Sequence, residues 1–279
     1  MSDVRSEMGT KEVIKVEEKA AYSKDWTKEG YTLKWEDNFE GDTLNRTDWN
    51  VELHEPGWVN EELQEYVDSD ENIKVKDGKL YIYPIRKKEE NGKCSYTSGR
   101  ITTQKKHDFI YGVFEVSAKV PYGKGYLPAF WLMATDENVY GQWPRCGEID
   151  IMEIMGQTPD TLHGTIHYGN PHAQSQGTYR LNAIENFSSG FHTFTCEWEP
   201  GSVKWYVDGI CYHEENDWYS ATAGRGTLAY PAPFNQPFYM ILNLAIGGSW
   251  VGYPDETTEF EDNPFVVEYV RVYQKDILL

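Results

Sequence analysis

One apolar run carries three carboxylates, and residues 147–156 read Gly147-Glu148-Ile149-Asp150-Ile151-Met152-Glu153-Ile154-Met155-Gly156. Acidic side chains are costly to bury without partners, so a hydrophobic strand that holds three usually holds them for chemistry. In a β-strand Glu148 and Asp150 share a face, whereas Glu153 has the opposite parity. A β-bulge, which adds one residue, would turn Glu153 onto that face. An edge strand with alternating polar residues fits poorly, because few positions of the run are polar. We predict a bulged strand with three carboxylates in one row.

Three carboxylates in a row supply what the cleavage of a glycosidic bond needs, because one can act as nucleophile and another as proton donor. A retaining site holds these two carboxyls about 5–5.5 Å apart. Five residues of a flat strand span roughly 16 Å. Glu148 and Glu153 can therefore cooperate only on a curved, bulged strand. The acid must also keep its proton while the nucleophile is ionised, so their environments must differ.

The segments on either side of this run have the patterns of β-strands. Residues 111–120 alternate between apolar and polar side chains, which predicts a strand with one face in the core. The face expected in the core carries Phe114, Val116, Ala118 and Val120. Residues 237–246 are almost continuously apolar, as expected for a central strand covered on both faces. We predict an all-β fold, a two-sheet antiparallel β-sandwich of the jelly-roll type.

Two Asp-Gly pairs mark hairpins. Asp77-Gly78 precedes the strand pattern of residues 79–83, and Asp208-Gly209 joins residues 202–207 to residues 210–212. A two-residue hairpin turn needs positive φ, which these residues tolerate. We expect a tight antiparallel turn at each pair.

Length and charge limit the class of protein. The 279 residues can form one large all-β domain, and 26 basic against 45 acidic residues give a net charge of −19. Nucleic acid and anionic membrane surfaces would be repelled, so neither is expected as a partner. An uncharged polysaccharide is compatible with this charge, and no run reaches transmembrane length.

The first 25 residues differ from the rest of the chain. They are rich in Lys, Glu and Ser and lack an apolar core, so they form neither a signal peptide nor an anchor. We expect residues 1–25 to be a flexible tail or linker left after removal of a secretion signal, and residues 26–279 to be a single catalytic domain of an extracellular protein. The cysteines lack metal-like spacing and their pairing stays open; they are Cys94, Cys146, Cys196 and Cys211.

The run from Glu148 to Glu153 resembles the E-x-D-x-x-E signature of glycoside hydrolase family 16, in its bulged, laminarinase-like form. Other segments agree in the expected order, and the similarity spans roughly residues 33–274. These segments are residues 57–64, 98–101, 129–133, 143–145, 163–169 and 243–250. The resemblance implies a concave, concanavalin-like jelly roll that cleaves β-1,3-glucan internally with retention of configuration. It also implies Glu148 as nucleophile, Asp150 as its orienting neighbour and Glu153 as general acid/base.

Sugar-binding clefts combine aromatic platforms with short polar groups, and the resemblance implies such residues here. The residues expected to bind substrate are Trp58, Asn60, Arg100, Trp131, Trp143, His167, Asn243 and Trp250. Arg100 is equally well explained as a structural ion pair. Core packing is the preferred role for Trp35, Trp49, Trp198 and Trp205.

Two sets of residues in the sequence are candidates for binding a metal ion. His163 and His167 lie about 13 Å apart on a strand, too far to share an ion, so packing is the simpler role for His163. No cofactor is expected for catalysis. The resemblance implies one structural calcium held by Glu40, the carbonyl of Gly78 and Glu268, where Glu268 replaces the usual Asp.

Several functions remain open from the sequence. A mixed-linkage lichenase, cleaving β-1,3/1,4-glucan, is the near alternative, and the same cleft could accept both glucans. Agarases and carrageenases share the signature, but a sulfated substrate would favour a basic cluster that the chain lacks. A lectin-like glucan-binding protein would be expected to have replaced the catalytic acids, and all three are present. A transglycosylase would differ by excluding water. We expect a monomer.

Overall fold

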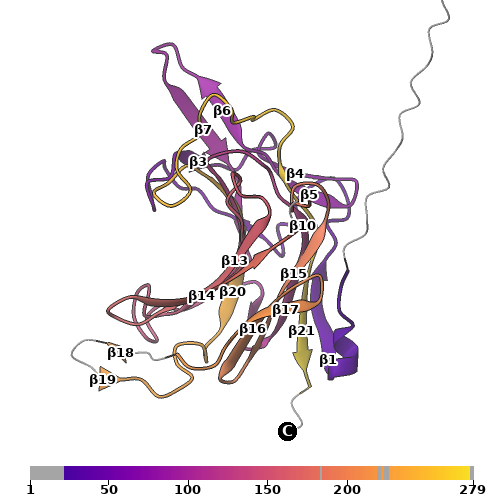
Figure 1. Cartoon of the computed structure of the whole chain (residues 1–279), viewed down its shortest axis with the longest axis vertical. Coiled ribbons are helices and arrows are strands. Elements are labelled where there is room, and N and C mark those ends of the chain that lie inside the picture. The colour runs from indigo at the N-terminus through magenta and orange to yellow at the C-terminus, as the bar shows by residue number, and fades with distance from the viewer. Residues whose placement is uncertain (1–21, 183, 219–220, 223–225, 277–279) are drawn as a thin grey trace, which may run out of the picture.

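The computed structural model describes residues 22–182, 184–218, 221–222 and 226–276. Two antiparallel eight-stranded sheets face each other as two layers (Figure 1). The first runs in the order β17 (Ile210–Glu215), β16 (Ser202–Val207), β15 (His192–Glu199), β10 (Gly112–Lys119), β21 (Phe265–Lys275), β5 (Lys79–Ile82) and β4 (Ile73–Lys76), with β1 (Tyr31–Asp37) also paired to β21. The second runs β14 (Ala173–Arg180), β13 (Thr161–Tyr168), β12 (Glu148–Glu153), β11 (Tyr126–Ala134), β20 (Phe238–Ile246), β8 (Arg100–Thr102) and β2 (Asn50–Val51), with β9 (Asp108–Phe109) paired to β20. The predicted two-sheet sandwich is confirmed.

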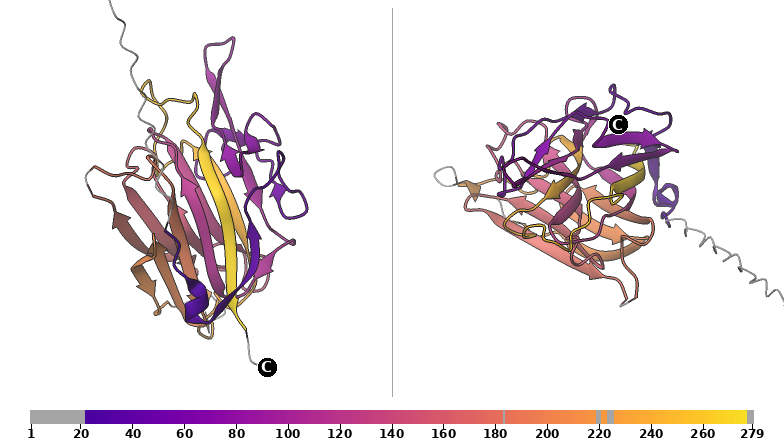
Figure 2. Two further views of the ribbon diagram at one scale, coloured as in Figure 1. Left: turned by 90° about the vertical axis from the view of Figure 1, so that its right-hand side faces the viewer. Right: turned by 90° about the horizontal axis from the view of Figure 1, so that it is seen from above.

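Smaller elements complete the described part of the chain. A three-stranded sheet contains β3 (Gln64–Tyr66), β7 (Cys94–Ser98) and β6 (Ile85–Lys88), and it projects at the top of Figure 1. A two-stranded sheet pairs β18 (Ala221–Thr222) with β19 (Gly226–Thr227). The 3-10 helix η1 (Trp26–Glu29) precedes β1, which lies beside the yellow β21 in Figure 2. Among these described elements, no helix is long and apolar enough to cross a membrane.

The core lies between the two large sheets, where apolar faces of both meet. β20 is buried along its whole length, as its continuous apolar run predicted. Trp49, Trp198 and Trp205 are fully buried and Trp35 packs against the same core, which confirms the packing role of all four. The two Asp-Gly hairpin turns are also confirmed. Positive φ is found at both residues of each turn, and the turns join β4 to β5 and β16 to β17.

β10 differs from its prediction on one face. Phe114, Val116 and Ala118 lie in the core as expected, but Glu115 on the opposite face is 1 % exposed. The start of the described chain covers this face, because Ser23 Oγ and Trp26 Nε1 both donate hydrogen bonds to the Glu115 carboxylate. Residues 1–21 of the expected tail lie outside the described residues.

Candidate active site

The predicted bulge is present in β12. Opposite β13, Asp150 pairs with Thr165 and Glu153 pairs with His163, so three steps along β12 match two along β13. The pairing with β11 shifts at the same place. The extra residue lies within residues 151–152, both of which point into the core. Glu153 is therefore turned onto the face of Asp150, and the bulge is confirmed.

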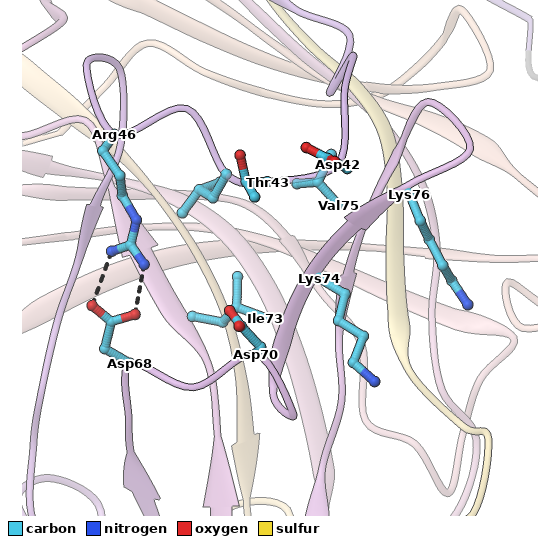
Figure 3. A pocket seen from close by; sticks show the side chains of 10 residues that line it. Asp42, Thr43, Arg46, Asp68, Asp70, Ile73, Lys74, Val75 and Lys76 are labelled. Atoms are coloured by element: carbon cyan, nitrogen blue, oxygen red, sulfur yellow. Dashed lines mark hydrogen bonds and ion pairs between the residues drawn. The ribbon is translucent and has the colours of Figure 1, made fainter.

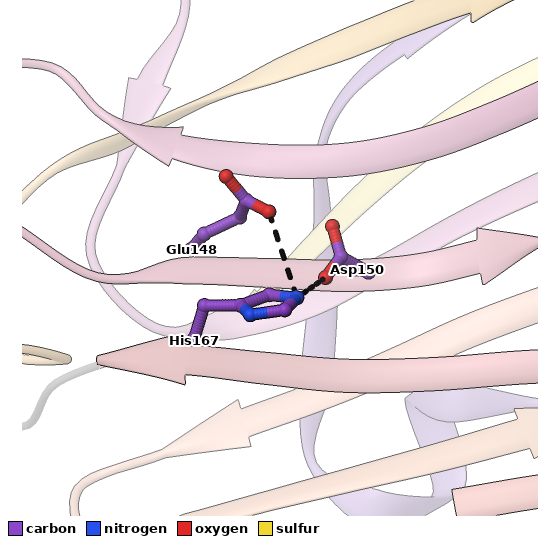
Figure 4. Close-up of side chains that lie close together, drawn as sticks. All are labelled: Glu148, Asp150 and His167. Carbon is purple, nitrogen blue, oxygen red and sulfur yellow. Dashed lines mark ion pairs between the residues drawn. The ribbon is translucent and has the colours of Figure 1, made fainter. Parts of the chain in front are cut away.

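Glu148, Asp150 and His167 form a cluster on the face of the second sheet that points away from the core (Figure 4). His167 Nε2 lies 3.2 Å from Asp150 Oδ2 and 3.8 Å from Glu148 Oε1. The other ring nitrogen of His167 lies 2.9 Å from Nε2 of His172. Asp150 Oδ2 is enclosed and makes no hydrogen bond of good geometry within the protein, so its attraction to His167 is mainly electrostatic.

Burial and mutual repulsion raise the pKa values of the two outer carboxyls. Burial first, and then the charge of Asp150, raises the pKa of Glu148 to about 8, against the opposing charge of His167. Burial and the charges of Asp150 and Glu148 raise the pKa of Glu153 well above its ordinary value. The charge of His167 and a hydrogen bond from Trp143 oppose the rise in the pKa of Glu148, whereas every cause acting on Glu153 raises its pKa. That is the division a proton donor and a nucleophile require.

His167 is the cationic group nearest to this set. Burial opposes its charge, but Asp150 and then Glu148 outweigh burial and raise the pKa of the imidazole. The two carboxyls therefore favour the protonated form of His167.

His163 stands at the other end of the row, directly opposite Glu153 on β13. Its Nδ1 lies 3.0 Å from Gln176 Nε2, and because an amide nitrogen only donates, Nδ1 accepts and Nε2 carries the proton. Its ring meets Trp250 edge-on, with centroids 5.3 Å apart. His163 therefore packs, as expected, but it does so beside the candidate acid and under an exposed tryptophan.

Arg100 is an ion-pair residue. Its guanidinium is buried, and its Nε donates to the carboxylate of Glu52. The guanidinium carbon lies 4.8 Å from the ring centre of Trp131 and 5.4 Å from that of Trp58. The structural alternative for Arg100 is therefore present, while the same contacts also hold the two candidate platforms in place.

Asn243 and Trp131 are joined directly. Trp131 Nε1 donates to Asn243 Oδ1 at 2.7 Å, and Asn243 Nδ2 donates to the hydroxyl of buried Tyr66 at 3.1 Å. This chain of hydrogen bonds fixes the plane of the Trp131 ring at the strand that pairs with β12. Asn60 lies apart from this chain and has a Glu62 oxygen as partner at 3.4 Å.

Three of the expected platforms are open to solvent. Trp58, Trp143 and Trp250 are 49 %, 47 % and 46 % exposed. Trp58 stacks on His54 with ring centres 3.5 Å apart. Trp143 lies against His172, 5.1 Å away. Exposed tryptophans held by neighbouring rings are suited to stack on the C–H faces of sugars.

Sequence reasoning did not find several partners of these residues. They are Glu52, His54, Glu62, Tyr66 and His172. Only His172 had a usable signal, because it follows His167 after a Pro-containing turn. The others belong to loops or short strands whose place beside the row depends on tertiary pairing.

The expected calcium ligands have other surroundings. Ser117 Oγ donates to Glu268 at 2.7 Å, and Lys79 Nζ lies 3.9 Å from the other oxygen of this carboxylate. Gly78 forms the β4–β5 turn and Glu40 is exposed in a loop. Among the described residues, one group of acidic and histidine side chains has metal-like spacing, and it is Glu148, Asp150 and His167.

A separate hollow of about 490 Å³ lies beside β4 (Figure 3). Asp42, Asp70 and Lys74 contribute to its lining, as do Arg46 and Asp68, which form an ion pair. Opposite charges neutralise one another here, and tryptophan does not contribute to the lining. The hollow therefore lacks the features of the carboxylate row.

Paired carboxyls in different electrostatic surroundings, set on a bulged strand and flanked by exposed tryptophans, define the class of glycoside hydrolases. The family model described as glycosyl hydrolases family 16 matches residues 58–262. The chain therefore belongs to glycosyl hydrolases family 16.

Relatives of this family agree with that placement. A glucan endo-1,3-beta-glucosidase from Cryptopygus antarcticus is 40 % identical over 255 residues, covering 86 % of this chain and 91 % of the relative. Glucan endo-1,3-beta-glucosidase A1 from Niallia circulans is 38 % identical over 88 % of this chain, but the match spans only 38 % of that protein. The solved endo-beta-1,3-glucanase from Pyrococcus furiosus has 38 % identity and a TM-score of 0.73, covering 88 % of this chain and 94 % of the other.

Proposed function

We propose that this chain hydrolyses β-1,3-glucan at internal bonds, with retention of anomeric configuration. The bulge of β12 carries this proposal, because it brings Glu148, Asp150 and Glu153 onto one face. The named activities of the Cryptopygus and Pyrococcus relatives support the substrate class.

The first step is the formation of a glycosyl-enzyme. Glu153 donates its proton to the glycosidic oxygen as the C1–O bond breaks, and a carboxylate oxygen of Glu148 forms the new bond to C1. The raised pKa of Glu153 keeps that proton in place until the bond breaks. The charge of His167 and the hydrogen bond from Trp143 favour the ionised form of Glu148, as a nucleophile requires, although burial raises its pKa to about 8.

The second step releases the sugar. Glu153, now a carboxylate, removes a proton from water while the water oxygen attacks C1 and the C1–O bond to Glu148 breaks. Two displacements at C1 restore the original configuration. Both carboxyls return to their starting protonation states.

Asp150 acts between these groups without touching C1. Its carboxylate lies 3.2 Å from His167 Nε2, and its charge is the second cause, after burial, of the raised pKa of both outer carboxyls. We assign Asp150 as the positioning residue whose charge raises the proton affinities of Glu148 and Glu153.

We propose that aromatic and amide groups around the three carboxylates of β12 bind the substrate. Trp58, Trp143 and Trp250 offer exposed rings, while Trp131 and Asn243 form a fixed pair beside β12. Arg100 is already paired with Glu52, so its proposed role is to hold Trp58 and Trp131. Asn60 and His167 are proposed to donate to sugar hydroxyls.

Product analysis tests the function directly. The purified chain is incubated with laminarin and, in parallel, with barley mixed-linkage glucan. We expect a ladder of short oligosaccharides from laminarin early in the reaction, and NMR should show the β-anomer first. Products from barley glucan alone would replace this proposal with a lichenase. Intact binding without products from either glucan would indicate a lectin-like protein.

Location and assembly form part of the proposal. A polymeric glucan does not cross a membrane, so we propose that the chain acts outside the cell, and we propose that it acts as a monomer. Fractionation of the producing cells and light scattering of the purified chain test these two points. Activity confined to the cytosol, or a stable dimer, would contradict them.

A structural calcium ion is a separate proposal, which rests on the family resemblance. The carboxylate of Glu268 already accepts from Ser117 and faces Lys79, which argues against it as a ligand. Melting temperatures in EDTA and in added calcium decide the matter. Equal values would remove calcium from this chain.

A further inference from the structure

The nucleophile end of the row has more negative charge than its protein neighbours balance. Glu148 and Asp150 share one imidazole, that of His167. The guanidinium of Arg100, the next candidate cation, is committed to Glu52. The cluster therefore needs a proton or a cation to become neutral.

The spacing of the three side chains suits a small divalent metal ion. One ligand atom from each lies within 4.8 Å of the others. His167 Nε2 is 3.2 Å from Asp150 Oδ2 and 3.8 Å from Glu148 Oε1. Tetrahedral zinc with bonds of about 2.0–2.2 Å sets its ligands roughly 3.3–3.6 Å apart. The two separations from His167 lie within a few tenths of an ångström of that range, and the third, between the two carboxylates, is at most 4.8 Å.

A second observation points to a ligand at the same place. The side chain of Asp150 is 4 % exposed, and its Oδ2 is enclosed without a hydrogen bond of good geometry. This atom is directed at His167 Nε2. A buried carboxylate oxygen without a hydrogen bond is costly, and a metal–oxygen bond would satisfy it.

His172 provides the outer contact that a histidine ligand usually has. A metal ion that binds Nε2 of His167 displaces the proton from that nitrogen, while Nδ1–H donates to His172 Nε2, 2.9 Å away. Metal-binding histidines are commonly fixed through their second nitrogen in this way. The mixed imidazole–carboxylate set favours zinc over calcium, which takes six to eight oxygen ligands.

We propose that Glu148, Asp150 and His167 bind one Zn²⁺ ion, with a fourth position open to solvent. An ion at this place occupies the carboxylate that attacks C1, so it inhibits in competition with glucan. The binding site stands on its own geometry, while the inhibition rests on the proposed function.

Calorimetric titration of the chelator-treated full chain with ZnCl₂ tests the site. We expect one ion per chain, and loss of that ion in His167→Ala. His107→Ala is the matched control, because His107 also pairs with a carboxylate, that of Asp48, outside the row. One ion must remain in the control. Retention of the ion in folded His167→Ala, or no binding to the parent chain, would overturn the proposal.

His172 separates a designed site from chance binding. We expect His172→Phe to weaken zinc binding about 10- to 100-fold, because the outer contact that orients His167 is lost. Circular dichroism confirms that the variant is folded. Unchanged affinity in folded His172→Phe would contradict the tautomer on which the site depends.

Kinetics test the inhibitory part separately. We expect zinc to raise KM for laminarin without lowering kcat, and EDTA to reverse the effect. Zinc that binds but leaves KM unchanged would overturn the inhibition while leaving the site. A chain without activity on any glucan in EDTA would instead refute the proposed function, and calorimetry would still judge the site.

Discussion

Glu115 and the carboxylates of β12 are buried on opposite sheets of one sandwich, yet their surroundings differ in kind. Glu115 accepts hydrogen bonds from Ser23 Oγ at 2.7 Å, Thr195 Oγ1 at 3.1 Å, Tyr269 OH at 3.1 Å and Trp26 Nε1 at 3.3 Å. Four neutral donors from three segments of the chain converge on one carboxylate. The arrangement satisfies the charge and joins the start of the described chain to the first sheet.

The row on β12 has the opposite character. Glu148, Asp150 and Glu153 are crowded against one another, and Asp150 Oδ2 has no hydrogen bond of good geometry. Glu115 is surrounded by hydrogen-bond donors, whereas the crowded carboxyls of β12 compete for protons. Burial alone therefore does not mark a catalytic acid. The number and kind of its hydrogen-bond partners do.

The largest expected effect comes from removing the nucleophile. Glu148→Ala is expected to lower kcat by about 10⁴-fold or more, because the covalent step is lost. Azide should restore turnover and give a product of inverted configuration, which NMR of the released sugar detects. Glu115→Ala is the matched control on the other sheet, and its kcat should stay within a few-fold of the parent. A retained product from rescued Glu148→Ala would exclude Glu148 as nucleophile.

Removing the acid is expected to have a smaller effect that depends on the leaving group. Glu153→Ala should lose about 10²- to 10⁴-fold on laminarin, since general acid catalysis contributes that range. Aryl glycosides with good leaving groups need less protonation, so their loss should be smaller. Steady-state rates on both substrates measure the difference. Equal losses on both substrates would show that Glu153 does not donate the proton, and that it is a buried carboxyl without a catalytic role, as Glu115 is.

The sequence allowed one side of this comparison to be predicted. The parity of Glu148, Asp150 and Glu153 within an apolar run was enough to predict a bulge and a shared face. Glu115 also stands in an alternating strand, where its parity predicted exposure. Its donors Ser23 and Tyr269 are 92 and 154 residues away. Local periodicity carries no information about partners so distant, and the pair of Arg100 with Glu52, 48 residues apart, was missed for the same reason.

The fold was accessible because its signals are local. Alternation, an uninterrupted apolar strand and Asp-Gly turns each depend on a few neighbouring residues. The order of strands in the two sheets is not local, since β10 lies between β15 and β21. It could be expected only from the family resemblance.

Asp150→Asn tests whether crowding sets the proton affinities. The Asp150 charge raises the pKa of both Glu148 and Glu153, so its removal should lower both. The acidic limb of kcat/KM follows ionisation of the nucleophile, and the alkaline limb follows loss of the acid proton. Both limbs should therefore move to lower pH. Limbs that stay in place would mean that burial, the first cause of both shifts, acts without help from Asp150.

The smallest effects, on stability, should have opposite signs at the two sites. The raised pKa of Glu148 means that the folded state binds its proton more tightly than the unfolded state does. Its contribution to stability is full below the ordinary pKa of about 4.3 and is lost as pH rises through about 8. Glu148→Gln removes that loss, so the variant should melt above the parent at pH 8 and close to it at pH 4.

Glu115→Gln should do the reverse. The amide places an N–H₂ group against side chains that already donate, so an acceptor is lost where hydrogen bonds from Trp26 and Thr195 converge. We expect a cost of about 1–3 kcal/mol, which for a chain of this size lowers Tm by about 2–4 °C per kcal/mol. Thermal unfolding of both variants at pH 4 and pH 8 compares the two sites. A stabilised Glu115→Gln would show that the buried Glu115 carboxylate destabilises the fold, as the carboxylates of β12 do. The contrast between the two sheets would then fail.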